Sequence, residues 1–225
     1  MFFKAEKLYK KFDSFEIEAS FEVEKNSMTG ILGESGSGKS TLLRIICGLE
    51  KSDSAETRIF LDEKEITKVP VQKREIGLVF QNAALFSHMN VLKNVSYGLL
   101  CKNYKKNEAY KISSEFLKKF NLSGFEKRSV ETLSGGEAQR VSLARTLIVK
   151  PKLVLFDESL SALDPPLRKK LGEEILLLQK EFSFTGIMVT HNVEEAKTLC
   201  QKIILLKKGK IVWQGKSEDF DESMM

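Results

Sequence analysis

The residues with the clearest chemical role form the segment Gly33-Glu34-Ser35-Gly36-Ser37-Gly38-Lys39-Ser40-Thr41. It matches the pattern G-x-x-x-x-G-K-[ST], between an apolar run and a helix-like segment. Glycines in such a loop let backbone N–H groups surround phosphate oxygens, and the helix N-terminus adds positive potential. Lys39 can reach the β- and γ-phosphates of a nucleotide, and the Ser40 hydroxyl can bind Mg²⁺. The alternative is a glycine-serine turn with a chance lysine, which the flanking strand and helix disfavour.

Two adjacent carboxylates, Asp157 and Glu158, follow the most apolar run of the chain. Burial of both without partners would be costly, so a metal ion or a water molecule must satisfy them. We expect Asp157 to bind Mg²⁺ and Glu158 to accept a proton from a water that attacks the γ-phosphate. The alternative is a helix N-cap followed by an acid in the first turn.

Two further polar side chains, Gln81 and His191, also follow apolar runs. His191 can hydrogen-bond the γ-phosphate, and the neutral amide of Gln81 can bridge Mg²⁺ and the attacking water. Taken alone, His191 could be a helix cap or a surface histidine, and Gln81 an ordinary loop glutamine. Their positions at strand ends favour the catalytic roles.

A second anion site is indicated by Leu133-Ser134-Gly135-Gly136-Glu137. Ser134 at the N-cap and Glu137 at the third helical position form a predicted capping box, which explains the serine and the acid. The two glycines are not explained by a cap, and they leave backbone N–H groups free to receive an anion. Because the loop at residues 33–41 holds its own nucleotide, this site would bind the γ-phosphate of a nucleotide held by another copy.

These residues need elements that position them, and the apolar pattern supplies four short buried strands, at residues 29–32, 77–80, 153–156 and 187–190. Parallel strands present their carboxyl ends at one edge of a sheet, where ligands bind. The pattern therefore predicts that Gly33, Gln81, Asp157, Glu158 and His191 share that edge.

The remaining segments complete an α/β domain. Residues 81–150 are rich in helix formers and too long for a crossover helix, so they are expected to form an inserted helical lobe. Residues 203–206 and 211–213 flank a glycine-containing turn, which predicts a hairpin. Trp213 is expected to pack this hairpin, with a ligand contact as the alternative.

Composition excludes several other classes of protein. The chain has 225 residues, 42% of them hydrophobic, which suits one compact domain or two small lobes that share a core. The net charge of +5 is spread along the chain and indicates no nucleic-acid partner. Its three cysteines lie far apart, so neither a disulfide framework nor a zinc site is expected. No apolar stretch approaches the roughly 20 residues of a membrane helix, and the N-terminus lacks a signal-peptide pattern.

Together these motifs resemble the ATP-binding cassette family. The loop at 33–41, Gln81, the signature at 133–137, the carboxylates at 157–158, Ser161-Ala162-Leu163-Asp164 and His191 stand in the family's order. The resemblance covers essentially the whole chain. It implies a P-loop NTPase core with a mainly parallel sheet, a small antiparallel β lobe and an inserted helical lobe, with boundaries near 1–81 and 151–225 for the core and 82–150 for the helical lobe.

The resemblance also assigns roles. In the family two cassettes enclose two ATP molecules head to tail, so Ser134, Gly135 and Gly136 would act on the nucleotide of the other copy. It implies that Glu158 is the catalytic base, that His191 is the switch histidine and that the Asp164 loop crosses the dimer interface. An adenine-stacking aromatic residue is expected at Phe12, with Tyr9 as a weaker candidate and a core role for either as the alternative.

Within the family, residues 79–99 look like those of importer cassettes for oxyanions, iron, polyamines and sugars, and the opening is most similar to molybdate, tungstate or sulfate cassettes. The resemblance implies a homodimer at the cytoplasmic face of the membrane, permease subunits and, indirectly, an extracytoplasmic solute-binding protein. Many related importer cassettes carry a further C-terminal regulatory domain that would begin after Gly215, so a length of 225 residues predicts none here. The alternatives are an efflux or lipid- and lipoprotein-handling cassette, a cassette acting on ribosomes or DNA, and a phosphate-binding regulatory module. Asn26, Ala55, Glu34, Ser159 and Met89-Asn90 depart from the usual pattern, and none of them removes a catalytic group.

Overall fold

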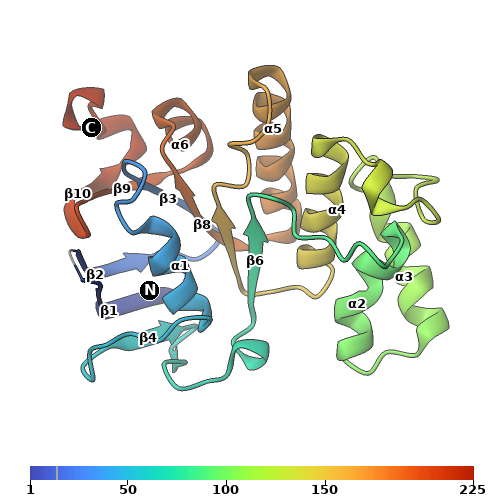
Figure 1. Cartoon of the computed structure of the whole chain (residues 1–225), viewed down its shortest axis with the longest axis horizontal. Helices are drawn as coiled ribbons and strands as arrows, with labels where there is room; N and C mark the ends of the chain where they lie inside the picture. Colours follow the sequence, from blue (N-terminus) through green and yellow to red (C-terminus); the bar gives the residue numbers. More distant parts are fainter. Residues whose placement is uncertain (14) are drawn as a thin grey trace. The chain divides into compact units, whose positions relative to one another are not determined.

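The computed structural model describes residues 1–13 and 15–225, which form two compact units. Unit 1 comprises Met1–Leu78, Lys152–Glu158 and Gly172–Met225, and unit 2 comprises Val79–Pro151 and Ser159–Leu171. Unit 1 carries nearly all of the strands, and unit 2 carries the helices between residues 81 and 150 (Figure 1).

The sheet has ten strands in the order β5-β4-β1-β2-β10-β9-β3-β8-β7-β6. Its middle is parallel, because β3 pairs in parallel with both β8 and β9, and β7 pairs in parallel with β8. One end is antiparallel, with β1 between β2 and β4. The strands are β1 (Phe3–Lys11), β2 (Glu16–Val23), β3 (Met28–Leu32), β4 (Arg58–Leu61), β5 (Lys64–Glu65), β6 (Ile76–Phe80), β7 (Leu153–Asp157), β8 (Thr185–Thr190), β9 (Lys202–Lys207) and β10 (Lys210–Lys216).

The four apolar runs predicted as strands are β3, β6, β7 and β8. β3 and β8 are buried at every position, as expected for strands covered on both faces. β2 instead alternates between exposed and buried residues, because only one of its faces meets the core. The predicted mixed fold, a P-loop core with a mainly parallel sheet and an antiparallel β lobe, is confirmed.

Helix α1 (Lys39–Cys47) lies against the sheet of unit 1. It begins after Gly38 and ends before Gly48, which have φ angles of 99° and 84°. Leu42, Leu43 and Ile46 are buried in a core cluster with side chains of β1 and β2. This packing fixes the N-terminus of α1 just beyond the end of β3 (Figure 1).

The C-terminal part of unit 1 contains the predicted hairpin. β9 and β10 pair antiparallel around Lys208 and Gly209, and Trp213 packs edge-on against Phe220 with ring centroids 5.2 Å apart. Trp213 is therefore a packing residue of the hairpin, as predicted. Unit 1 also contains η1 (Val71–Lys73), α6 (Val193–Leu199), η3 (Ser217–Asp219), η4 (Glu222–Met224) and the C-terminal part of α5 (Pro165–Phe182).

Unit 2 is helical between β6 and β7. Its elements are α2 (Val91–Cys101), α3 (Lys106–Lys118), η2 (Val130–Thr132) and α4 (Gly135–Leu147), and α5 (Pro165–Phe182) begins in unit 2 and ends in unit 1. Buried Val95, Leu117 and Val141 belong to α2, α3 and α4. Among the described residues of both units, no helix has the length and apolar character needed to cross a bilayer.

Candidate functional site

The loop between β3 and α1 has the backbone that the phosphate-binding pattern requires. Gly36 and Gly38 have φ angles of 80° and 99°, a region that residues with a Cβ rarely adopt. A Cβ on Gly33 would overlap the backbone oxygen of Leu206, and one on Gly38 would come within 2.6 Å of Ile17 Cδ1. Glycine is therefore required at Gly33 by close packing and at Gly36 and Gly38 by conformation.

The N-terminus of α1 keeps its hydrogen-bonding capacity for an anion. Its N-cap is Gly38, which has no side chain to cap the helix, and the first turn holds no acid. The N–H groups of Ser40 and Thr41 lie in this turn, where an α-helix leaves N–H groups unsatisfied. The Ser37 hydroxyl is buried and has no hydrogen-bond partner among the described residues. Glu34 and Ser35 are exposed at the tip of the loop.

Lys39 folds back over this loop. It is only 4% exposed, and its Nζ donates hydrogen bonds of 2.8 Å to the carbonyl oxygens of Gly33 and Glu34. Burial lowers the pKa of Lys39, and the nearby carboxylates of Glu158 and Asp157 oppose that change. The ammonium group is thus held at the loop, where it can exchange carbonyl oxygens for phosphate oxygens.

Asp157 ends β7 and accepts a hydrogen bond of 2.6 Å from the Ser40 hydroxyl. Mg²⁺ prefers hard oxygen ligands and in nucleotide sites takes one or two from the protein, the rest coming from phosphates and waters. A hydroxyl and a carboxylate in contact fit this need. No group of three or more His, Cys, Asp or Glu side chains suited to a metal occurs among residues 1–13 and 15–225. The Ser40 hydroxyl and the Asp157 carboxylate suit Mg²⁺ whose other ligands are phosphates and waters, because they supply two hard oxygen ligands.

Glu158 lies between two other predicted residues. Its Oε1 is 3.6 Å from Lys39 Nζ, and its Oε2 is 3.5 Å from His191 Nδ1. Its backbone has a φ of 46°, although its N–H still bonds the Val189 carbonyl at 3.2 Å. A non-glycine residue in this region is strained by about 1–3 kcal/mol, and such strain concentrates at functional sites.

His191 follows β8, and its side chain is 54% exposed. The cap of the next helix is the neighbouring Asn192, whose side chain accepts a hydrogen bond of 2.9 Å from the Glu195 N–H. The alternative role of His191 as a helix cap is therefore filled by another residue. Its ring stays accessible next to Glu158.

An aromatic pair, Phe12 and Phe15, borders the loop. Their ring centroids are 6.2 Å apart with planes at 25°, and Phe12 N donates to Phe15 O at 2.7 Å. The Phe15 ring lies 3.3 Å from where a Cβ on Gly38 would stand, and Phe12 is 41% exposed. Tyr9 instead donates its hydroxyl to Glu16. Sequence reasoning did not name Phe15.

Unit 1 thus gathers the predicted residues Gly33, Lys39, Asp157, Glu158 and His191. Gln81 follows β6 and belongs to unit 2, where it is exposed. Its place beside the others at the sheet edge stays a prediction.

The signature segment of unit 2 has the predicted capping box. Ser134 N donates to Glu137 Oε2 at 2.8 Å, and Glu137 N donates to Ser134 Oγ at 3.4 Å. The hydrogen bonds from Ser134 hold the pKa of the Glu137 carboxyl below its ordinary value. This cap fixes where α4 begins.

The two signature glycines differ in their surroundings. Gly135 is exposed, and a Cβ there would meet only Leu163 Cδ2, at an ordinary 3.5 Å. Gly136 is buried, and a Cβ would come within 2.9 Å of Leu167 Cδ2. Packing therefore explains Gly136, whereas nothing in unit 2 requires glycine at Gly135.

Asp164, in the segment after Glu158, caps α5, because its Oδ1 accepts a hydrogen bond of 3.1 Å from Leu167 N. Arg168 on the same helix donates to the carbonyl oxygens of Ser161 (3.2 Å) and Leu163 (2.9 Å). Arg168 therefore holds the loop that carries Asp164. Sequence reasoning missed it, because a surface arginine on a helix gives no local signal.

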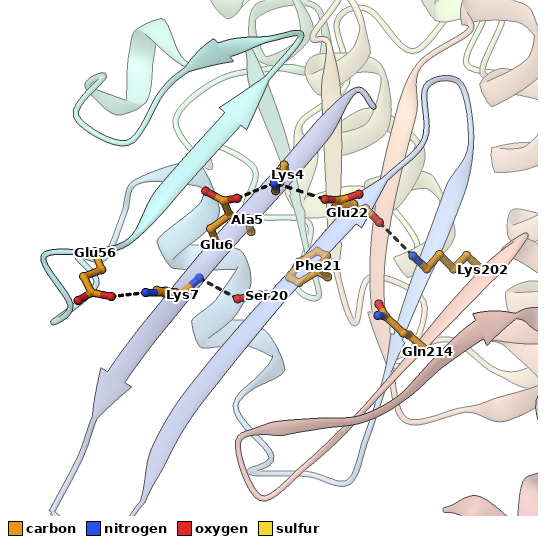
Figure 2. Close-up of a pocket in the computed structure, with 10 residues that line it drawn as sticks. All are labelled: Lys4, Ala5, Glu6, Lys7, Ser20, Phe21, Glu22, Glu56, Lys202 and Gln214. Carbon is orange, nitrogen blue, oxygen red and sulfur yellow. Dashed lines mark hydrogen bonds and ion pairs between the residues drawn. The ribbon is translucent and has the colours of Figure 1, made fainter.

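A separate hollow of about 530 Å³ lies on the solvent-facing side of β1 and β2 (Figure 2). Its charged groups already have partners: Lys4 pairs with Glu6 (2.6 Å) and Glu22 (3.6 Å), Lys7 pairs with Glu56, and Lys202 donates to the Glu22 carbonyl (3.3 Å). None of the predicted site residues lines it. We assign the hollow no role in nucleotide binding.

The chain is similar in sequence to known ABC transporter ATP-binding proteins. A family model described as ABC transporter matches residues 18–161. The Fe(3+) ions import ATP-binding protein FbpC of Mannheimia succiniciproducens is 44% identical over 88% of the chain, which covers 56% of that relative. The probable sulfate/thiosulfate import ATP-binding protein CysA of Chlorella vulgaris is 42% identical over 96% of the chain, which covers 92% of it. The chain thus spans little more than half of the iron relative.

Solved structures agree in fold. cbiO1 from Clostridium perfringens, part of the ABC transporter complex cbiONQ, superposes with a TM-score of 0.86 at 28% identity, over 97% of this chain and 89% of the other. A dimeric ATP-binding cassette in a post-hydrolysis state, bound to ADP and Pi, superposes with a TM-score of 0.83 at 30% identity, over 97% and 100% of the two chains.

Proposed function

Because the chain belongs to the ABC transporter family, we propose that it binds and hydrolyses ATP as a subunit of an importer, and that it drives solute uptake through separate membrane subunits. The observation that carries this proposal is the contact set around Glu158. Its carboxylate lies 3.6 Å from Lys39 and 3.5 Å from His191, and the neighbouring Asp157 bonds Ser40. The residues that we propose to bind phosphate, to hold Mg²⁺ and to act as the base therefore lie next to one another in unit 1.

ATP binding uses the loop and the aromatic pair. The N–H groups of residues 34–41 receive the phosphates, Lys39 Nζ moves from backbone carbonyls to phosphate oxygens, and the adenine stacks on Phe12. Phe15 supports Phe12 from behind by the ring contact already described. This division of contacts separates base recognition from phosphate recognition.

Ser40 and Asp157 would hold Mg²⁺, with Gln81 as a further ligand. When bound, the ion neutralises charge on the β- and γ-phosphates. Lys39 contributes the same kind of stabilisation from the protein side, because its ammonium group stays next to the transferred phosphoryl group.

Glu158 is the base of the hydrolytic step. It accepts a proton from a water molecule, whose oxygen forms a bond to the γ-phosphorus as the bond to the bridging oxygen of ADP breaks. His191 donates a hydrogen bond to a γ-phosphate oxygen and orients the same carboxylate. ADP and inorganic phosphate are the products.

A second copy completes the site. The signature residues Ser134, Gly135 and Gly136 would contact the γ-phosphate held by the other cassette, and the Asp164 loop would cross the interface. In support, Gly135 is exposed and has no packing reason to be glycine. In this arrangement unit 1 corresponds to the ATP-binding core lobe and unit 2 to the helical lobe.

Importer function is favoured over efflux or lipid handling by the relatives, whose names describe import of Fe(3+) ions and of sulfate or thiosulfate. The partners would be a second cassette, permease subunits and, indirectly, an extracytoplasmic solute-binding protein. The chain would then work at the cytoplasmic face of the membrane, docked on its permease.

The test is ATP turnover by the purified chain, with and without Mg²⁺, compared with the Glu158→Gln variant. We expect hydrolysis that requires Mg²⁺ and falls at least about 100-fold in the variant, with nucleotide binding kept. A chain that binds ATP but never hydrolyses it, alone or with its permease, would instead be a regulatory module.

A further inference from the structure

The segment that follows Gln81 contains two consecutive residues in an unfavourable conformation. Ala83 and Ala84 have φ angles of 52° and 47°. A Cβ disfavours this left-handed region, and an alanine side chain cannot offset the strain with a hydrogen bond of its own. Two such residues in succession persist only where surrounding groups hold them.

The group that holds them is Arg145, near the end of α4. One terminal nitrogen, Nη1, donates to the Ala84 carbonyl at 2.8 Å, and the other, Nη2, donates to the Ala83 carbonyl at 3.0 Å. A planar guanidinium can bond two adjacent oxygens at once, and its charge strengthens both bonds. The guanidinium carbon also lies 5.2 Å from the centroid of the Phe86 ring.

Because Arg145 is partly buried, its two hydrogen bonds to the alanine carbonyls contribute more to stability than they would in water. Desolvation lowers the pKa of Arg145, so the charged group gains most from acceptors placed close to it. Its oxygen partners are the two alanine carbonyls and, at 3.5 Å, the Asn94 side chain. The Arg145 guanidinium therefore binds chiefly the carbonyl oxygens of Ala83 and Ala84, the two residues with left-handed backbone.

Two further polar side chains tie down the rest of the segment. Asn94, fully buried on α2, accepts from Phe86 N (2.9 Å) and donates to the carbonyls of Phe86 (3.1 Å) and Met89 (3.1 Å). On the other side of Gln81, Gln139 of α4 donates to the Phe80 carbonyl at 3.2 Å. Helix α4 thus holds the backbone both before and after Gln81.

We propose that Arg145 is a positioning residue for Gln81: it locks the Ala83–Ala84 backbone onto α4, so that Gln81 and the signature serine at the start of α4 are carried by the same rigid element. This inference rests on the proposed function, in which both residues meet ATP. The two ends of α4 then serve one purpose, since Ser134 begins the helix and Arg145 fixes the Gln81 loop near its end.

The test compares Arg145→Lys, which keeps the charge but cannot span two carbonyls, with Ile148→Val, which trims a buried side chain just after α4 and removes no hydrogen bond to the loop. We expect Arg145→Lys to lower kcat at least about tenfold, with KM for ATP changed less than about twofold, because ATP binds chiefly to unit 1. Ile148→Val should lower the unfolding temperature of unit 2 and leave kcat unchanged.

A second measurement does not depend on activity. Amide hydrogen exchange in residues 82–90 should speed up at least about tenfold in Arg145→Lys, while exchange in residues 136–144 stays within about threefold of wild type. Ala84→Gly in the Arg145→Lys background should recover part of kcat, because glycine adopts the left-handed region without strain.

Unchanged kcat and unchanged exchange at residues 82–90 in Arg145→Lys would overturn the inference. So would an equal rise in exchange along both segments, because that would mean Arg145 only stabilises the unit as a whole. A wild-type chain without ATPase activity would overturn the proposed function instead, and the exchange experiment would still decide whether Arg145 holds the loop.

Discussion

The Ser40 hydroxyl donates a hydrogen bond of 2.6 Å to Oδ1 of Asp157, a residue 117 positions further along the chain. Ser40 stands in the first turn of α1 and Asp157 at the end of β7, so the contact depends on the helix and the strand being held in one unit. The fold of unit 1 therefore places the two oxygens proposed to bind Mg²⁺ next to each other.

Substitution of Ser40 tests this arrangement. Ser40→Ala removes the hydroxyl, and we expect it to raise the Mg²⁺ concentration for half-maximal ATP hydrolysis at least about tenfold, which corresponds to about 1.4 kcal/mol. Ser40→Thr keeps a hydroxyl at the position where the motif accepts either residue, so its requirement should stay within about threefold of wild type. A magnesium titration of ATPase activity measures both. If Ser40→Ala and Ser40→Thr need the same Mg²⁺ concentration for half-maximal ATP hydrolysis, the Ser40 hydroxyl is not a ligand of Mg²⁺.

Glu158 can be tested as the base by Glu158→Gln, which preserves shape and removes the proton acceptor. We expect kcat to fall at least about 100-fold, because a positioned base typically contributes about 10²–10⁴-fold. ATP affinity, measured by equilibrium dialysis, should not fall, since the contact between this carboxylate and Lys39 competes with phosphate. Glu173→Gln, an exposed change on α5, is the matched control. Undiminished turnover in Glu158→Gln would exclude Glu158 as the base.

The position of Asp157 and Glu158 beside the loop at residues 33–41 could be predicted from sequence, because two acids directly after an apolar strand need a partner and the glycine-lysine motif supplies one. The strands β3, β7 and β8 could be predicted for the same reason, since full burial leaves a continuous apolar run. These signals are local.

What could not be predicted depends on contacts between distant segments. The left-handed backbone of Glu158 and that of Ala83 and Ala84 have no signature in residue type, because glycine or asparagine would be expected there. Arg145 looks like any helical arginine until the loop folds against it. Tertiary hydrogen bonds, rather than local preference, determine these positions.

The capping box of α4 predicts a pH dependence. Ser134 holds the pKa of the Glu137 carboxyl below its ordinary value of 4.5, so the charged form stabilises the fold above about pH 4.5 and this contribution is lost as pH falls through the lower folded-state pKa. Glu137→Gln keeps the acceptor oxygen without the charge. At pH 7 we expect it to unfold about 1–3 °C below wild type, because an acid at a helix N-terminus contributes about 0.3–1 kcal/mol.

Thermal unfolding followed by circular dichroism at pH 7 and at a pH acid enough to protonate Glu137 in the folded state should show the difference in unfolding temperature between wild type and Glu137→Gln at pH 7 and not at the acid pH. Ser134→Ala, which removes the other half of the box, should be destabilised at both pH values by about 1 kcal/mol. A gap between wild type and Glu137→Gln that stays constant from pH 7 to the acid pH would show that the charge of Glu137 has no part in the cap.

Adenine stacking distinguishes Phe12 from Tyr9. Base–aromatic stacking is worth about 1–3 kcal/mol, so Phe12→Ala should raise KM for ATP roughly tenfold while leaving kcat nearly unchanged. Phe12→Tyr keeps the ring and should behave like wild type. Tyr9→Phe removes only the hydroxyl that bonds Glu16 and should have no effect on KM. If Tyr9→Ala raises KM for ATP and Phe12→Ala does not, Tyr9 rather than Phe12 stacks on the adenine.

A head-to-tail dimer predicts that two inactive chains restore each other. Lys39→Ala disables the phosphate-binding loop, and Gly135→Asp places a negative charge where the signature would meet the γ-phosphate of the other copy. Gly135 is exposed and a Cβ there makes only an ordinary contact, so this substitution should not disturb the fold, and an acid suits a helix N-terminus.

In a mixed dimer, one site combines both defects and the other has an intact loop and an intact signature. Random assortment of equal amounts of the two chains makes about half of the dimers mixed, and each mixed dimer has one intact site of two. We therefore expect about a quarter of wild-type ATP turnover. Turnover would be lower than this if the intact site needs a working second site. Gly135→Ala, which adds no charge, is the control for the loss of glycine. Lys39→Ala and Gly135→Asp should each be inactive when assayed alone. No recovery on mixing, with dimers present by light scattering, would mean that loop and signature do not meet between copies.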